Sequence, residues 1–184
     1  MMKLIICLTG MPGAGKSTVA KSFTNSCFQV LSMGDVIRRE AERRGLEPTD
    51  ENLGRIMLEL RDKQGLGAVA NLVVDEIKDD KRHVIIDGLR NMKEVEILKQ
   101  HGRVKVLAIH APRDKRLEYL RKRNRSDAPK SIEEFDARDK RELAVGLGEA
   151  ISYADAIIMN DSTIDDLKKK AYDIIERWKS ELNA

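Results

Sequence analysis

The sequence predicts an α/β fold, in which a five-stranded parallel sheet is doubly wound and covered by helices on both faces as a three-layer sandwich. Short apolar runs alternate with longer amphipathic stretches along the 184 residues. The apolar runs are nearly continuous in Val, Ile and Leu, which is typical of strands that are buried on both faces. Alternation of such strands with helices implies right-handed crossovers.

Five apolar runs are expected to form the strands, and the stretches between them the helices. The expected strands span residues 3–8, 28–31, 83–86, 104–109 and 156–159. Helical patterns cover residues 16–25, 35–44, two segments within 49–79, 92–100 and 114–123. Ser131, followed three residues later by Glu134, predicts a capping box ahead of a helix that ends near residue 145. Ser162 and Thr163 are expected to open a last helix that runs towards residue 182.

The chain is expected to form a single domain. Its length fits one domain, and the sequence contains neither an internal repeat nor a low-complexity linker. Two long stretches interrupt the simple alternation, at residues 34–80 and 113–152. Ligands of open α/β sheets bind at the carboxyl ends of the strands, so both stretches are expected to cover a site there. Such stretches often close over a substrate and exclude water.

The composition indicates a compact globular protein. Charged residues make up 35% and apolar residues 41% of the chain, and the net charge of +3 gives no strong case for a nucleic-acid or membrane partner. Cys7 and Cys27 form no C-x-x-C pair, so a cytoplasmic location is expected. No apolar run approaches the length of a membrane span, and the first one is too short for a signal peptide. His83, His101 and His110 show no metal-site spacing.

Residues 10–17 read GMPGAGKS and match the phosphate-loop pattern G-x-x-x-x-G-K-[ST]. The motif lies between an apolar strand and a helical stretch. In that context its backbone N–H groups and the helix N-terminus can close around an anion. Lys16 can reach the outer phosphates, and the Ser17 hydroxyl can bind magnesium. The sequence therefore predicts a P-loop NTPase that binds ATP and Mg²⁺. The expected nucleotide-binding residues are Gly10, Met11, Pro12, Gly13, Ala14, Gly15, Lys16, Ser17 and Thr18.

Asp87 follows the apolar run at residues 83–86 and is expected at the carboxyl edge of the sheet. This is the Walker B arrangement, in which a carboxylate beside the phosphate loop holds magnesium, here together with Ser17. An acid at a strand end can also cap a helix, and that alternative stays open. Gly88 permits a close approach of the backbone to a ligand.

Three segments together carry a resemblance to a known family. Residues 10–17, the stretch SMGDVIR at residues 32–38 and DGLR at residues 87–90 resemble the adenylate kinase and dephospho-coenzyme A kinase branch of P-loop kinases. The chain resembles the archaeal adenylate-kinase-related proteins more closely still. The match runs nearly end to end and includes the R-D-x-x-E element at residues 138–142. The resemblance implies a helical acceptor-binding insertion at residues 34–80 and a lid at residues 113–152.

The resemblance also assigns acceptor-binding roles. It implies that Arg38 grips the phosphate of the acceptor, for which a bidentate guanidinium is chemically suited, although a solvated arginine in a charged helix is the alternative. Asp35 either orients a magnesium-bound water or caps its helix. Arg90 corresponds to a second phosphate-binding arginine, but the family pattern places one more residue, a proline, before it. Gly34 completes this set. Met33 replaces a base-contacting threonine of adenylate kinases, which leaves the acceptor base open.

The lid resemblance points to arginines that close over the transferred phosphoryl group. At helical spacing Arg121 and Arg125 lie along one flank and Arg116 and Arg123 along the other. Arg121 and Arg125 are the first candidates, with Arg138 as a further one. An RNA-binding surface is the alternative, but few aromatic residues are present for stacking on bases.

The function expected from these features is an ATP- and Mg²⁺-dependent kinase that phosphorylates a nucleoside monophosphate, with AMP as the favoured acceptor. Lys16, Arg38, Arg121, Arg125 and Arg138 are its expected catalytic residues. The acceptor site is expected to include Gly34, Asp35, Arg38, Asp87, Gly88 and Arg90. The alternative is a nucleotide-binding module or slow ATPase that acts with a protein or RNA partner. The sequence leaves the oligomeric state open.

Overall fold

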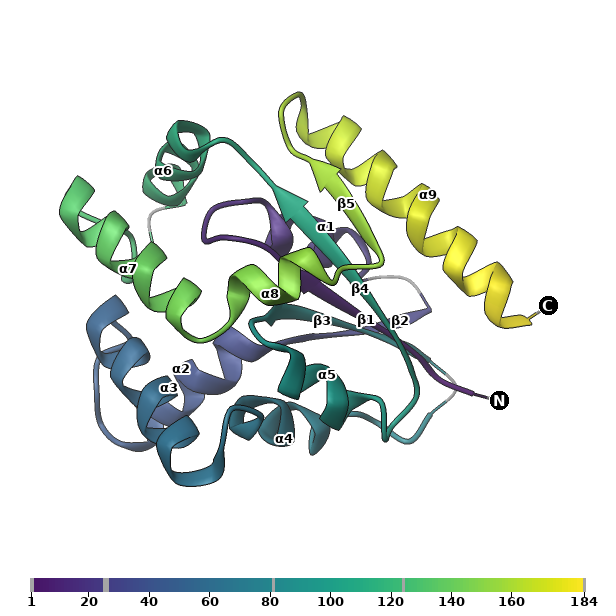
Figure 1. Cartoon of the computed structure of the whole chain (residues 1–184), viewed down its shortest axis with the longest axis horizontal. Coiled ribbons are helices and arrows are strands. Elements are labelled where there is room, and N and C mark those ends of the chain that lie inside the picture. Colours follow the sequence, from purple (N-terminus) through teal and green to yellow (C-terminus); the bar gives the residue numbers. More distant parts are fainter. Residues whose placement is uncertain (1, 25–26, 81, 124, 184) are drawn as a thin grey trace.

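A computed structural model describes residues 2–24, 27–80, 82–123 and 125–183. Figure 1 shows a central sheet with helices on both sides. All strand pairs in the sheet are parallel, and the strand order is β2-β3-β1-β4-β5. The strands are β1 (Leu4–Thr9), β2 (Phe28–Ser32), β3 (His83–Leu89), β4 (Arg103–His110) and β5 (Ala156–Met159). The predicted five-stranded parallel sheet is confirmed.

The helices lie in two layers. They are α1 (Lys16–Ser22), α2 (Met33–Arg43), α3 (Asp50–Gln64), α4 (Ala68–Val74), α5 (Met92–Leu98), α6 (Arg113–Lys122), α7 (Ile132–Ala144), α8 (Leu147–Ser152) and α9 (Ile164–Asn183). Side chains alternate between the two faces along a strand. Accordingly, Leu4, Ile6 and Leu8 of β1 pack with α1 and α9, whereas Ile5 and Cys7 pack with α2, α3, α4, α5 and α8.

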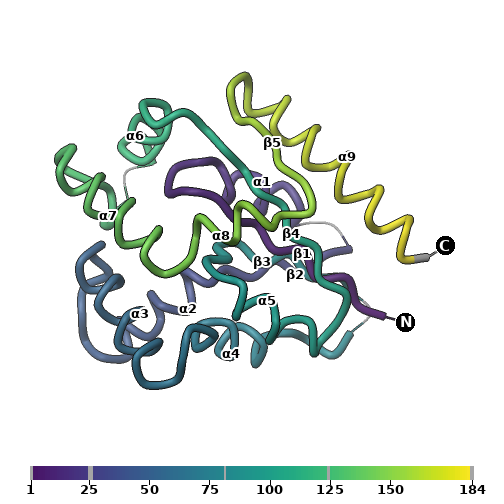
Figure 2. Tube along the Cα trace, in the orientation of Figure 1, coloured from purple at the N-terminus to yellow at the C-terminus, as the bar shows by residue number. Residues whose placement is uncertain are grey.

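Both long excursions lie at the carboxyl end of the sheet. In Figure 1 the strands point towards the side that carries α6 and α7 of the lid region (residues 113–152) and α2 and α3 of the insertion (residues 34–80). The two ends of the chain lie on the opposite side in Figure 2. The fold therefore brings both excursions to the edge where the phosphate loop (residues 10–17) leaves β1.

Side-chain caps set several helix starts. The Ser32 hydroxyl accepts a hydrogen bond from the Asp35 N–H (3.2 Å), so α2 begins two residues before the predicted start. The capping box predicted at Ser131 forms only in part: the Ser131 hydroxyl accepts from the Glu134 N–H, but the Glu134 carboxylate accepts from the Lys130 N–H instead of the Ser131 N–H. A complete capping box, which the sequence analysis did not predict, joins Asn91 and Glu94 at the start of α5.

Three expectations about the elements need correction. Helix α1 ends at Ser22, short of the predicted end at residue 25, which lies outside the described residues. Helix α8 was not predicted and follows Gly146, which adopts a left-handed conformation with φ of 102°. Strand β5 is not buried on both faces, because Ile157 is 56% and Met159 is 44% exposed at the edge of the sheet. Within the described part of the chain, no helix has the length and apolar character to cross a membrane.

Candidate functional site

The phosphate loop fits its surroundings so closely that it depends on glycine. Gly10, Gly13 and Gly15 have φ values of 141°, 81° and 110°, a region that residues with a side chain seldom adopt. A Cβ atom at Gly10 would lie 2.1 Å from the Ile109 carbonyl oxygen of β4, and one at Gly13 would lie 2.5 Å from the Arg116 carbonyl oxygen of α6. The strand edge and the lid region thus fix the shape of the loop.

Lys16 closes the loop from inside. Its ammonium group donates hydrogen bonds to the carbonyl oxygens of Gly10 (2.6 Å) and Met11 (3.1 Å). Burial of the ammonium group lowers the pKa of Lys16 to about 8, although the nearby Asp87 opposes this shift. The lysine is therefore held by two carbonyl oxygens that an incoming phosphate can replace with stronger, charged acceptors.

Ser17 and Asp87 meet at the foot of the loop. The Ser17 hydroxyl donates to the Asp87 Oδ2 atom (2.7 Å), and Asp87 lies beside Leu8 of β1 in the sheet. A hydroxyl and a carboxylate oxygen are ligands that suit Mg²⁺, which commonly takes its remaining ligands from phosphates and water. Among the described residues no group of three His, Cys, Asp or Glu side chains is placed to hold a metal ion. A magnesium ion here would need the phosphates of a nucleotide, which is the usual arrangement in P-loop enzymes.

These residues line a cavity of about 500 Å³ between the sheet edge, the insertion and the lid region. Most of the predicted site residues lie in its wall: Gly10, Pro12, Gly13, Gly15, Lys16, Ser17, Thr18, Gly34, Arg38, Asp87, Gly88, Arg90, Arg125 and Arg138. Four predicted residues do not line it: Met11, Ala14, Asp35 and Arg121. The structure thus brings together the phosphate loop, the end of β3 and several arginines.

Three of the arginines in the cavity wall contact one carboxylate. Arg38 of α2, Arg123 at the end of α6 and Arg138 of α7 form the arginine trio, and each donates to the Asp127 Oδ2 atom, at 3.3, 3.2 and 3.0 Å. The Asp127 side chain is only 1% exposed. Burial alone would raise the pKa of Asp127, but the positive charges of the trio outweigh it and hold the pKa below its ordinary value.

Asp35 neither caps its helix nor faces the cavity. Ser32 supplies the cap of α2, and the Asp35 side chain is 55% exposed and accepts a hydrogen bond from Arg38 Nη1 (2.8 Å). Its place in this structure fits a residue that orients Arg38. Of the two roles expected for Asp35 from sequence, the helix cap is supplied by Ser32 instead, and the orientation of a magnesium-bound water stays a prediction.

Arg90 is bound by Glu142, a residue that the sequence analysis noted only as part of the R-D-x-x-E element. Arg90 donates from Nε to Glu142 Oε2 (2.5 Å), from Nη2 to Oε1 (3.3 Å), and from Nη1 to the Gly88 carbonyl oxygen (2.8 Å). Burial would raise the pKa of Glu142, but Arg90, followed by Arg138 and Lys16, outweighs it and lowers the pKa to about 2. Arg90 lies in the cavity wall as predicted, with its guanidinium already engaged.

The lid arginines differ from the predicted pairing. Arg121 is exposed, whereas Arg123 lines the cavity together with Arg125. Helical spacing had placed Arg121 and Arg125 on one flank, but α6 ends at Lys122, so the spacing does not extend to Arg125. Arg116 is buried and contacts the phosphate loop and α7.

Arg116 anchors the lid region to the phosphate loop. Its guanidinium donates to Asp139 of α7 at 2.7 and 3.0 Å and to the carbonyl oxygen of Pro12 at 3.0 Å, and it lies 4.9 Å from the ring centre of Phe135. Asn160, after β5, supports the loop from another side, because its amide donates to the Ala14 carbonyl oxygen (2.9 Å). Neither contact was predicted from sequence.

Asp127 lines the cavity and was not predicted from the sequence. One signal was present, because Asp127 is the only acidic residue between Glu118 and Glu133 and it follows a run of arginines. A single acidic residue in such a basic stretch is expected to form ion pairs with the neighbouring arginines. The sequence does not show, however, that Arg38 and Arg138 reach the same carboxylate.

Comparisons with known proteins agree with this geometry. A family model described as "AAA domain" matches residues 9–136. The UPF0200 protein of Pyrococcus abyssi is 47% identical over 180 residues, which cover 95% of this chain and 96% of the relative. A gluconokinase from Sinorhizobium meliloti 1021 has a TM-score of 0.62 at 14% identity, over 99% of this chain and 97% of the kinase. Shikimate kinase from Acinetobacter baumannii, solved with shikimate, has a TM-score of 0.59 at 20% identity, and the match covers 98% of this chain and 95% of the shikimate kinase. The two structures show a shared fold, that of P-loop kinases.

Proposed function

The chain belongs to the UPF0200 family and to the AAA domain family, and we propose that it is a kinase that transfers the γ-phosphoryl group of ATP to a nucleoside monophosphate, with AMP as the favoured acceptor. One observation carries this proposal. The phosphate loop and the arginine trio line the same cavity, so a donor triphosphate and an anionic acceptor can lie in one space. Small-molecule kinases with the same fold support the reaction class.

The donor side would use the phosphate loop. Its amides and Lys16 would hold the β- and γ-phosphates, with Lys16 exchanging the carbonyl oxygens of Gly10 and Met11 for phosphate oxygens. Ser17 and Asp87 would hold Mg²⁺, which supplies charge neutralisation at the transferred group. Lys16 and Arg125 would stabilise the negative charge that spreads over the γ-phosphoryl oxygens.

The acceptor side would use Arg38, supported by Arg123 and Arg138. Guanidinium groups match phosphate oxygens in geometry and charge, and three of them converge at one place in the cavity. The resemblance to adenylate kinases favours AMP among nucleoside monophosphates. The mechanism is then positioning and electrostatic stabilisation, and a phosphate acceptor needs no protein nucleophile.

A coupled assay of phosphate transfer from ATP tests the proposal, with AMP, CMP, UMP, GMP, dephospho-coenzyme A, gluconate and shikimate as acceptors. We expect turnover with AMP. Lys16→Ala should abolish productive ATP binding, whereas Arg38→Ala should weaken only AMP binding, because Lys16 belongs to the phosphate loop and Arg38 to the arginine trio.

Arg39→Ala is the matched control for Arg38→Ala. Arg39 is the next residue of α2, is 53% exposed and pairs with Glu76 outside the cavity, so its loss should leave AMP binding nearly unchanged. If Lys16→Ala and Arg38→Ala lowered both affinities equally, separate donor and acceptor sides would be wrong. If ATP bound but no acceptor were phosphorylated, the kinase proposal would fail.

A second candidate function is a nucleotide-binding module or slow ATPase that acts with a partner. The observation that favours it is that Asp127 and Glu142 already occupy four of the arginines on the acceptor side: Arg38, Arg123, Arg138 and Arg90. ATP hydrolysis that rises when a partner protein or RNA is added, with no acceptor phosphorylated, would support this candidate over the kinase.

A further inference from the structure

The arginine trio binds a group of the protein itself. Arg38 of the insertion and Arg123 and Arg138 of the lid region reach the same oxygen of Asp127, and Arg138 also donates from Nη1 to the Asp127 main-chain carbonyl oxygen (2.8 Å). Charge-assisted hydrogen bonds of this kind are the ones expected around a phosphate oxygen. The carboxylate of Asp127 thus lies where a phosphate held by the trio would lie.

The trio keeps binding capacity beyond this one carboxylate. Its only buried acidic partner among the described residues is Asp127. Asp35 and Asp50 contact Arg38 and Arg138 from the outside, with 55% and 32% of their side chains exposed, so water screens those charges. In addition, the Nε–H group of Arg123 is buried and lacks a hydrogen-bond acceptor in the part of the chain that the structure describes, whereas the Nε atom of Arg138 lies 3.3 Å from Asp50 Oδ1. A group with more charge and more oxygens than a carboxylate would satisfy the trio better.

We propose that Asp127 is an internal competitor that weakens the binding of every anion to the trio by one common factor, so that dianionic phosphate groups bind whereas monoanionic carboxylates and neutral groups bind too weakly to be held. The inference rests on the proposed function in placing the acceptor against the trio. The acceptor must displace Asp127 before it contacts the three arginines. Asp127 lies in the irregular segment between α6 and α7, outside any helix or strand, so its side chain can turn away without breaking an element.

Displacement favours phosphate for a simple electrostatic reason. A ligand carboxylate would replace one single negative charge by another and would gain no net attraction from the trio. A phosphate monoester carries nearly two negative charges at pH 7 and three strong acceptor oxygens. Its exchange with Asp127 therefore adds both charge and hydrogen bonds. Acceptors that carry a single carboxylate and no phosphate, as gluconate and shikimate do, would bind to the trio only weakly while Asp127 competes with them.

The test compares two ligands that share a nucleoside, AMP and adenosine 5′-carboxylate, by calorimetric titration of the full chain. Wild-type protein should bind AMP at least about tenfold more tightly than the carboxylate, since each 1.4 kcal/mol of charge preference is worth about that factor. Asp127→Asn, which keeps the shape and removes the charge, should bind AMP about three- to tenfold more tightly than wild type. The affinity for the carboxylate should rise by a similar factor, because the cost of displacing Asp127 is common to both ligands.

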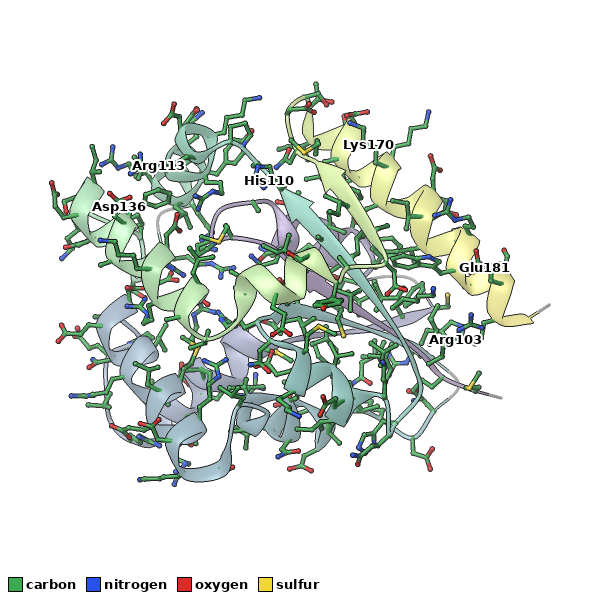
Figure 3. The ribbon with its side chains drawn as sticks, viewed as in Figure 1. Arg103, His110, Arg113, Asp136, Lys170 and Glu181 are labelled. Atoms are coloured by element: carbon green, nitrogen blue, oxygen red, sulfur yellow. The ribbon has the colours of Figure 1, made fainter. Side chains whose placement is uncertain are left out.

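Asp136→Asn is the matched control. Asp136 of α7 pairs with Arg113 of α6, and Figure 3 shows these two side chains together on the outer side of the lid region. Both are about half exposed and neither lines the cavity. Loss of this carboxylate should leave the affinities for AMP and for the carboxylate analogue within about a factor of two of the wild-type values, because an exposed ion pair contributes little.

Several outcomes would overturn the inference. If Asp127→Asn weakened AMP binding, Asp127 would be a support that orders the arginines. Unchanged affinity would show that it does not compete. If Asp127→Asn failed to fold, the wild-type comparison would still decide, because near-equal binding of AMP and its carboxylate analogue contradicts a charge filter. If neither AMP nor inorganic phosphate showed binding that Arg38→Gln weakens, the trio would not be a phosphate site. Binding without any phosphoryl transfer would refute only the proposed function.

Discussion

The ammonium group of Lys16 is expected to change its protonation when a phosphate binds beside it. In this structure it is buried against two carbonyl oxygens, and burial lowers the pKa of Lys16 to about 8. A bound triphosphate would favour the charged form and raise this pKa. We therefore predict that ATP binding takes up a fraction of a proton near pH 8, and that the affinity for ATP falls as the pH rises from 7 to 9. Calorimetric titrations in buffers with different ionisation enthalpies measure the uptake.

Lys16→Arg is the control for this prediction. A guanidinium stays protonated across the whole range, so any remaining ATP binding by this variant should proceed without proton uptake near pH 8. Absence of uptake in the wild type at pH 8 would mean that Lys16 is already fully charged in the free protein.

At the residue scale, the sequence predicted the parts of the site that belong to contiguous motifs. The phosphate loop and Asp87 lie as expected because a strand end and a short motif fix them locally. Asp127 and Glu142 were not recognised as site residues, since Asp127 contacts Arg38 across 89 positions of sequence and Glu142 contacts Arg90 across 52. Arg123 was not recognised either, because its place in the site comes from its contact with Asp127. Arg121 was favoured because a helix was assumed to continue past residue 122, where it ends.

At the scale of elements, four of the five strands were predicted within a few residues and β5 was predicted with its observed bounds. The sequence did not show that β5 is an exposed edge strand, because a short apolar run does not reveal whether helices cover one face of the strand or both. It also did not show α8, since six residues after a left-handed glycine are too few to display a helical period. The capping box predicted at Ser131 forms only in part, whereas a complete one forms at Asn91. Asn caps a helix N-terminus as well as Ser or Thr does.

The fit of the phosphate loop against α6 supports a prediction about two glycines. Gly45→Ala should lower the free energy of unfolding by about 1–2 kcal/mol, because a residue with a side chain is strained at the Gly45 φ of 69°. Steric contact should add nothing, since within the described part of the chain no other atom lies within 4 Å of the new Cβ. Gly13→Ala has a similar φ of 81° and also places its Cβ 2.5 Å from a carbonyl oxygen of α6. Overpacking should add about 1–3 kcal/mol.

Urea unfolding of the two variants measures the difference. Gly45 is the matched control, because it carries the same backbone cost in a loop with open space around it. Equal destabilisation of the two variants would mean that α6 can move away from the loop at no cost. The lid region would then not support the phosphate loop as the structure indicates.

At the scale of the whole molecule, the site depends on direct contact between the insertion and the lid region. Asp50 at the start of α3 pairs with Arg138 and Arg141 of α7, and the Ser126 hydroxyl donates to the Pro48 carbonyl oxygen. The sequence predicted that both excursions would cover the carboxyl edge of the sheet. It did not predict that they hold each other, because complementary charges in two distant segments are not visible in a linear pattern.

The pair of Glu142 and Arg90 joins the lid region to β3, so its ionisation should affect the stability of the whole molecule. The pKa of Glu142 is lowered from its ordinary 4.5 to about 2, mainly because Arg90 opposes the effect of burial. A lowered carboxyl pKa adds stability that is complete above about pH 4.5 and is lost as the pH falls towards 2. This contribution amounts to at most roughly 3 kcal/mol. Glu142→Gln, which lacks the charge, should therefore be less stable than wild type at pH 7 by up to this amount.

Chemical denaturation between pH 2 and pH 7 tests the prediction, because the gap in unfolding free energy between wild type and Glu142→Gln should close as the pH falls from 4.5 to 2. Glu149→Gln is the control: Glu149 is an exposed residue of the neighbouring α8, and its variant should follow the wild-type curve throughout. A gap that stays constant with pH would show that Glu142 acts through shape and hydrogen bonding alone. A gap that closes only for Glu142→Gln would show that one buried charge pair helps to hold the lid region on the sheet.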